Sequence, residues 1–249
     1  MKKVLLILIC LVSFGGVAQN TQLFDQGKEA YRAERYQDAI NAWLKIVDNG
    51  MHSVALYHNL GNAHYKLNNI GPSIYYYEKA LRLSPDEDEV INNLAFAQNA
   101  TVDAIEPLPQ TVFSSWYKKI SGILSYGGWA VASIVFSMGF VLLFLCYYFS
   151  ASEGRKRLFF VTSLASTLLF FITLIMAFKT YGDYINDTPA IIFAESSEVK
   201  SEPNLRSEIA FTLHEGTKVQ IIEEEADWVR IEIIDGKDGW IPASDLKAL

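Results

Sequence analysis

The chain has 249 residues, of which 51% are apolar and 20% charged, and its mean hydropathy is +0.15. These values exclude a disordered or fibrous protein, which would be polar or repetitive in composition. The apolar residues form blocks, one at the N-terminus and two between Gly128 and Phe178, so a membrane protein with soluble parts is expected. The net charge is −7 and both soluble parts are acidic, which argues against a nucleic-acid partner.

The first 18 residues have the order of a secretory signal peptide. The basic start Met1–Lys3 precedes the apolar run Val4–Val12, and the small residues Gly15–Ala18 follow. We therefore predict a signal peptide over residues 1–18, cleaved after Ala18. The alternative is an uncleaved membrane anchor.

A 34-residue period follows. When residues 20–53 are aligned with residues 54–87, similar residues superpose: Gly27 on Gly61, Tyr31 on Tyr65, Ile40 on Ile74 and Trp43 on Tyr77. A small residue thus recurs where two helices must approach closely, and a ring recurs beside it. The pattern resembles the tetratricopeptide repeat (TPR), most closely in the second unit, which Pro85 ends. The resemblance implies an α-helical TPR array over residues 19–104.

The array is short. Asp86–Val102 matches the first helix of a third repeat, but no second helix follows it. We therefore expect this helix to cap the array. Since about three repeats are usually needed for independent stability, we expect the stack to be stabilised by contact with a partner or with the membrane.

The first helices of such repeats form a concave wall. On that wall, residues spaced four apart share one helix face. The candidate protein-binding residues are Lys28 and Arg32, then His58, Asn62 and Lys66, with Asn92 on the third helix. This cationic, amide-bearing groove predicts binding of an acidic peptide or a C-terminal carboxylate. The alternative is an ordinary solvated helix face.

Residues 105–128 connect the array to the apolar segments. Pro107 and Pro109 make a stiff, extended start. After Thr111, apolar residues recur at helical spacing: Phe113, Trp116, Tyr117, Ile120 and Leu124. This pattern predicts an amphipathic helix on the membrane surface, with a loop as the alternative.

Trp129–Phe149 and Leu158–Phe178 are apolar segments of 21 residues each that lack charged side chains. As helices they would each span about 31 Å, which matches a hydrocarbon core of about 30 Å. We predict a transmembrane hairpin around a cytoplasmic loop, residues 150–157, with a buried soluble hairpin as the alternative. The cations Arg155–Arg157 favour a cytoplasmic loop, but Lys118, Lys119 and Lys179 on the outer flanks equal them in number. The export signal decides the orientation, and both soluble parts are expected in the periplasm of a bacterial inner-membrane protein.

After a linker over residues 179–188, the pattern changes to period two in residues 189–249. About five short strands are predicted, with Asp235-Gly236 as a tight turn. A small all-β barrel, closed or nearly closed, would hide the strand edges.

Three stretches of this region resemble a bacterial SH3-like domain: His214–Val219, Asp227–Ile231 and Asp235–Pro242. The resemblance implies exposed aromatic side chains that hold peptides or cell-wall glycopeptide. Trp228 and Trp240 are the candidate binding residues, beside the loop Asn204–Glu208. The alternative is that both tryptophans serve packing.

No catalytic constellation is apparent. HExxH, GxSxG and phosphate-cradling motifs do not occur. The only cysteines, Cys10 and Cys146, lie in apolar segments and offer no thiolate metal site. We expect no enzyme activity, no catalytic residue, no metal and no cofactor.

Taken together, the order of signal, TPR units, membrane hairpin and SH3-like barrel resembles the BatE-like membrane proteins of the Bacteroides aerotolerance (Bat) group. The resemblance implies a multidomain membrane scaffold. Its partners would be Bat proteins with von Willebrand factor A domains, associated with a MoxR-type ATPase, and its role would concern oxygen or envelope stress. The alternative function is a cell-wall sensor whose SH3-like domain binds peptidoglycan.

Overall fold

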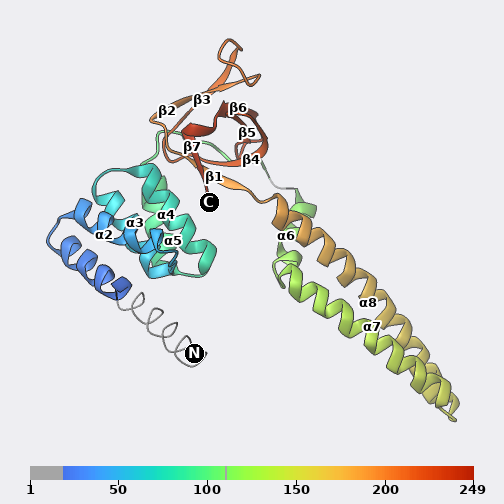
Figure 1. Cartoon of the computed structure of the whole chain (residues 1–249). Helices are drawn as coiled ribbons and strands as arrows, with labels where there is room; N and C mark the ends of the chain where they lie inside the picture. Colours follow the sequence, from blue (N-terminus) through green and yellow to red (C-terminus); the bar gives the residue numbers. More distant parts are fainter. Residues whose placement is uncertain (1–18, 110) are drawn as a thin grey trace, which may run out of the picture. The chain divides into compact units, whose positions relative to one another are not determined.

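The computed structural model describes residues 19–109 and 111–249 (Figure 1). These residues form two compact units. One combines the chain up to Pro107 with Thr188–Leu249, and the other is Leu108–Asp187. The predicted signal peptide, residues 1–18, lies outside the described residues.

The first unit begins with a stack of helices. A helix covers residues 19–32. It is followed by α2 (Tyr36–Asp48), α3 (Val54–Lys66), α4 (Ile70–Leu83) and α5 (Asp88–Gln98). Consecutive helices pack against each other, and the largest fully buried side chains in the stack include Trp43 and Tyr77. The predicted helical array with a final single helix is therefore present.

The two repeats are built alike, even though the first matches the TPR pattern less closely. A Cβ atom on Gly27 would lie 2.2 Å from the Trp43 ring, and one on Gly61 would lie 2.5 Å from the Tyr77 ring. The turn between the two helices of each repeat contains a residue with positive φ, Glu34 at 59° and Asn68 at 60°. Both glycines are thus required by the close approach that the alignment predicted.

The strands of the first unit are β1 (Pro189–Ile192), β2 (Ser196–Lys200), β3 (Ile209–His214), β4 (Lys218–Glu225), β5 (Trp228–Glu232), β6 (Asp238–Pro242) and β7 (Leu246–Ala248). They form one antiparallel sheet in the order β3-β2-β6-β5-β4-β1-β7. A 3-10 turn, Ala243–Asp245, precedes β7. The predicted turn at Asp235-Gly236 joins β5 to β6, and Gly236 has a φ of 83°.

The sheet corrects two expectations: it has seven strands instead of about five, and it does not close. The strands β3 and β7 lie at its two ends and do not pair with each other in the part of the chain that the structure describes. The two strands that the sequence did not predict are β2, whose residues are mostly polar, and β7, which has only three residues. Both are recruited by hydrogen bonding to neighbouring strands.

The sheet packs directly on the helical stack, chiefly on α4. Ile191 of β1 is fully buried and belongs to the hydrophobic core of the helices. Phe193 meets the ring of Tyr75 edge to face, with 5.5 Å between the ring centroids. The Nζ atom of Lys218 lies 2.7 Å from a carboxylate oxygen of Glu78, which is nearly buried. The helices therefore pack against the chain's own sheet, a support that the sequence did not predict.

Polar groups complete this contact. The backbone N–H of Gly71, in the first turn of α4, donates to the Glu215 carboxylate at 3.0 Å. The residue before α4, Asn69, forms no side-chain cap, so the sheet supplies the anion that a helix N-terminus favours.

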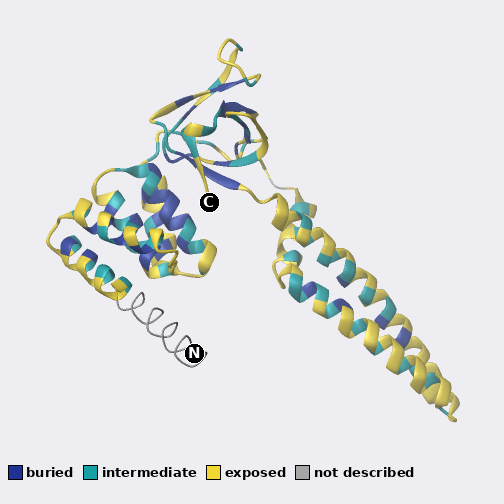
Figure 2. Ribbon diagram, viewed as in Figure 1, coloured by how far each residue is buried: buried dark blue, intermediate teal, exposed yellow. Residues whose placement is uncertain are grey.

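The second unit contains α6 (Val112–Ser121), α7 (Tyr126–Phe149) and α8 (Glu153–Asn186). Both α7 and α8 are long and apolar enough to cross a membrane. Only 6% and 17% of their most apolar windows are buried, and Figure 2 shows them exposed along most of their length. A buried soluble hairpin would cover these surfaces, so the exposure favours the membrane interpretation.

The helices of this unit run beyond the predicted apolar segments. The α8 helix covers residues that the sequence assigned to the loop 150–157 and the linker 179–188. Neither stretch contains a proline, so only residues 150–152 separate α7 from α8, and α8 continues to Asn186. The two helices approach closely at Ser166, whose hydroxyl donates to the carbonyl of Phe136 at 2.7 Å.

The predicted amphipathic helix is α6. Thr111 caps its start by accepting the Ser114 N–H at 3.2 Å. The ring of Phe113 is 87% exposed and that of Trp116 is 67% exposed. Tyr117 faces α8 instead, where its hydroxyl donates to Asp183. The exposed apolar face suits a bilayer surface.

A pH dependence follows from His64, whose ring stacks on Tyr76 in the helical core. Burial, and secondarily the charge of Lys247, lower its pKa from 6.5 to about 4. The unfolded chain therefore takes up a proton between pH 6.5 and pH 4 that the folded chain does not. The free energy of unfolding should fall by about 1–3 kcal/mol over this range.

Urea unfolding of the full chain in detergent at pH 7 and pH 4.5 measures this loss. His64→Gln should remove it, whereas His52→Gln, at an exposed position, should retain it. An equal loss in all three proteins would contradict the assignment to His64.

Candidate functional site

The candidate site is a cavity on the wall formed by the first helices of the repeats. Its volume is about 280 Å³. Its lining side chains come from the helix over residues 19–32, α3, α4 and α5: Tyr31, Asn62, Tyr65, Lys66, Tyr77, Asn93 and Phe96. We call this cavity the groove. The mix of aromatic and amide side chains is typical of ligand sites.

A hydrogen-bonded network fixes the floor of the groove. The Oδ1 atom of Asn62 accepts from the Tyr77 hydroxyl at 2.6 Å and from Asn93 Nδ2 at 3.0 Å. The Nε2 atom of His58 lies 3.2 Å from Asn62 Nδ2 and 2.9 Å from Asn93 Nδ2. Three helices are therefore joined by polar side chains, which hold the two amides in one orientation.

Burial of the Tyr77 ring raises the pKa of its hydroxyl. The hydroxyl therefore stays protonated at neutral pH and can donate to Asn62. The same ring fills the gap beside Gly61, so one residue serves both the helix packing and the site.

The rim of the groove carries aromatic rings and one cation. Phe96 is 64% exposed, Tyr65 is 38% exposed, and Lys66 is exposed as well. Lys66 has no ion-pair partner among the described residues. An ammonium group beside amides can hold a carboxylate, and the rings can cover apolar side chains.

The structure brings together three of the predicted groove residues, His58, Asn62 and Lys66. Lys28 does not line the cavity; its Nζ atom lies 3.9 Å from Asp25 and 5.8 Å from the centroid of the Phe24 ring. Arg32 is exposed on the same helix, outside the lining residues.

Asn92 is exposed and outside the lining residues, and its neighbour Asn93 enters the network instead. The 34-residue offset pointed to Asn92, but neighbouring repeats are rotated, so equivalent positions do not face each other. The sequence signal that could have identified Asn93 is its i, i+3 spacing with Phe96, which places both residues on one face of α5.

The predicted tryptophans lie on neighbouring strands of the sheet. Trp228 pairs with Pro242 and Trp240 with Arg230, so the two occupy diagonal positions on one face. Trp228 is half-buried, whereas Trp240 is only 8% exposed. No group of three or more metal-ligating side chains occurs among the residues with described positions.

Comparisons with known proteins identify the two soluble modules. Residues 54–87 match the tetratricopeptide repeat family, and residues 196–247 match the bacterial SH3 domain family. The chain thus contains a TPR repeat and a bacterial SH3 domain, which suggest protein-binding or cell-wall-binding roles. A search of curated proteins gave no significant match.

Among solved structures, the chain is similar to an NlpC/P60 family protein from Bacillus cereus, with 13% identity. The alignment covers 28% of this chain and 23% of the other, and its TM-score is 0.22. This likeness is too low to indicate a shared overall fold or an activity.

The matched pair Asn92 and Asn93 tests the network. Asn93→Ala removes a donor to Asn62 and to His58, and the loss should cost about 1–2 kcal/mol of unfolding free energy. Asn92→Ala, at an exposed position on the same helix, should cost less than about 0.5 kcal/mol. Urea unfolding of the full chain in detergent compares them, and equal costs would contradict the geometry.

Proposed function

We propose that this chain is a non-enzymatic scaffold of the bacterial inner membrane that binds partner proteins through its groove. The observation that carries this proposal is the network of Asn62, Asn93, His58 and Tyr77 beneath an open cavity rimmed by Lys66. Polar side chains are locked there without a ligand, so little ordering is needed when a peptide binds.

The chemistry of the groove favours an acidic peptide segment or a C-terminal carboxylate. Lys66 on the rim would hold the negative charge, and Lys28 and Arg32, which lie on the first helix outside the lining, would attract it at longer range. Tyr31, Tyr65 and Phe96 offer ring surface for the flanking side chains. The rest of the helical module is acidic and would repel an acidic peptide, which disfavours binding at other surfaces of the module.

The proposal places α7 and α8 across the bilayer and α6 on its surface. Their exposed apolar faces support this arrangement. The signal-like residues 1–18 support a periplasmic location of both soluble modules.

For the partner, we propose a membrane protein of the Bat group that carries a von Willebrand factor A domain, in a complex linked to oxygen or envelope stress. The support is the order of the modules along the chain: signal, TPR units, two apolar helices and SH3-like domain.

Charge removal at the groove tests the proposal. The double variant Lys28→Ala, Lys66→Ala should reduce crosslinked partner recovered from intact cells at least fivefold, because it removes two cations that would attract the carboxylate. Lys45→Ala, an exposed lysine on α2 away from the groove, is the matched control and should recover partner normally. Undiminished recovery with the double variant would contradict the groove as the binding site.

Peptidoglycan binding is the second candidate function, favoured by the match of residues 196–247 to the bacterial SH3 domain family and by the half-buried Trp228. Detergent-solubilised full chain should then pellet with purified peptidoglycan. Trp228→Ala should lower the pelleted fraction several-fold, and Trp116→Ala on α6 should not. A chain that stays in the supernatant would exclude this function.

A further inference from the structure

The strand β3 has one open edge, and the linker after α5 covers only part of it. In the described chain β3 pairs with β2 alone, at one end of the sheet. The linker, residues 101–107, runs from the helical module past this edge, and Ile105 packs against the hydrophobic core of the sheet. The open edge of a strand is a template for pairing with another extended segment.

Asp103 fixes the linker to the end of β3. Its carboxylate accepts from the His214 backbone N–H at 2.7 Å, from the Thr217 hydroxyl at 2.6 Å, and lies 2.7 Å from His214 Nδ1. Burial raises the pKa of Asp103, but these hydrogen bonds outweigh it and lower the pKa overall. The Asp103 carboxylate is therefore ionised at neutral pH. Its hydrogen bonds hold the linker at a fixed distance from β3.

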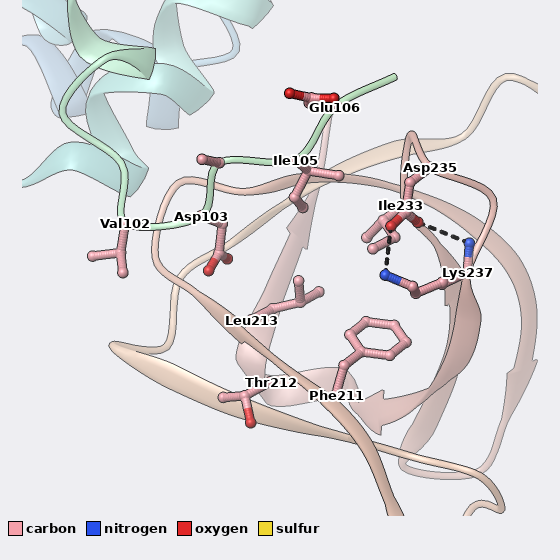
Figure 3. A pocket seen from close by; sticks show the side chains of 11 residues that line it. Val102, Asp103, Ile105, Glu106, Phe211, Thr212, Leu213, Ile233, Asp235 and Lys237 are labelled. Carbon is pink, nitrogen blue, oxygen red and sulfur yellow. Dashed lines mark hydrogen bonds and ion pairs between the residues drawn. The ribbon is translucent and has the colours of Figure 1, made fainter. Parts of the chain in front are cut away.

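Beyond this attachment, linker and sheet enclose a slot of about 450 Å³ (Figure 3). One wall is the linker, Val102–Glu106, and the other is Phe211–Leu213 of β3. Ile233, Asp235 and Lys237 close one end, where Lys237 forms an ion pair with Asp235. The apolar side chains of Ile105, Phe211, Leu213 and Ile233 are part of its lining.

The backbone of β3 offers unpaired groups to this slot. The His214 N–H points away from β2, since it reaches Asp103. In an antiparallel strand, residues two apart present their N–H and C=O groups to the same side. Thr212 therefore presents its backbone donor and acceptor to the slot that it lines.

The charge around the slot is negative. Glu106 is exposed at its rim and has no ion-pair partner in the described chain, and Asp103 and Asp235 are also part of the lining. Residues 188–249 as a whole contain 13 acidic and 6 basic residues. A segment with basic side chains thus complements both the slot and the module around it.

We propose that the slot is a second peptide-binding site, separate from the groove, which takes an extended protein segment with basic side chains. The segment adds a strand to β3 through Thr212, places apolar side chains against Phe211 and Ile105, and directs basic side chains to Glu106. Backbone pairing supplies affinity, and alternate side chains supply selectivity.

Fluorescence anisotropy on the full chain in non-ionic detergent tests the proposal. The probes are labelled hexapeptides that alternate lysine with valine, or glutamate with valine. The basic probe should bind at least tenfold more tightly at low salt. Glu106→Gln should weaken it two- to fivefold, as expected for an exposed ion pair. The matched control Glu224→Gln changes an exposed carboxylate of β4 outside the slot and should leave affinity unchanged.

The strand pairing has its own test. Thr212→Pro removes the backbone donor and should weaken the basic probe at least tenfold. The unaltered protein gives a second measurement: a basic probe N-methylated at every residue should lose affinity to the same extent, because its backbone can no longer donate.

Three outcomes would overturn the proposal. They are equal affinity for acidic and basic probes, unchanged affinity for the N-methylated probe, or binding of a purified muropeptide but not of the basic hexapeptide. The groove variant Lys28→Ala, Lys66→Ala should bind the basic probe normally. The proposals for the slot and for the groove can therefore be tested independently of each other.

Discussion

The structure of the soluble unit depends on the packing of β1 against α4. Two repeats and a single further helix bury too little surface to be a typical free-standing array. Ile191 inserts into the helical core, and Glu215 and Lys218 satisfy polar groups of α4 at its first turn and along its length. The sheet thus covers helix surface that a further repeat would bury in a longer array. Removing either module would expose apolar surface on the other.

This packing has a consequence for how the two modules can work. If they were joined by a flexible tether, each could bind a partner independently of the orientation of the other. Here the linker is anchored by Asp103, and Gly216 of the β3–β4 turn fits against Ile70, Ile74 and Thr101 of the helical part. The groove and the slot therefore lie on one compact unit. If both proposed sites bind, a partner with an acidic segment and a basic segment at matching separation would engage them at once.

The groove shows how one residue can serve both helix packing and a candidate binding site. Tyr77 fills the space beside Gly61 and also donates to Asn62, so the position of the amide is set by the same contact that joins α3 to α4. The network extends to α5 through Asn93. A site built in this way is rigid, because moving any one side chain would disturb the helix contacts below it.

Much of the architecture could be read from the sequence because it rests on local patterns. The recurrence of Gly27 and Trp43 as Gly61 and Tyr77 predicted paired helices, and the alternation around Trp228 predicted strands. The long uncharged stretches likewise predicted α7 and α8. Each of these signals comes from a helix or strand that repeats its burial pattern over several turns or residues.

Only the tertiary structure decided what depends on orientation between elements. It selected Asn93 over Asn92, because the rotation between repeats determines which residue of α5 faces α3. It buried Trp240, left the sheet open at β3, and placed Asp103 beside His214 more than a hundred residues later in the chain. Contacts over such separations leave no period in the sequence, because they are set by the packing of one module on another and not by the pattern within either.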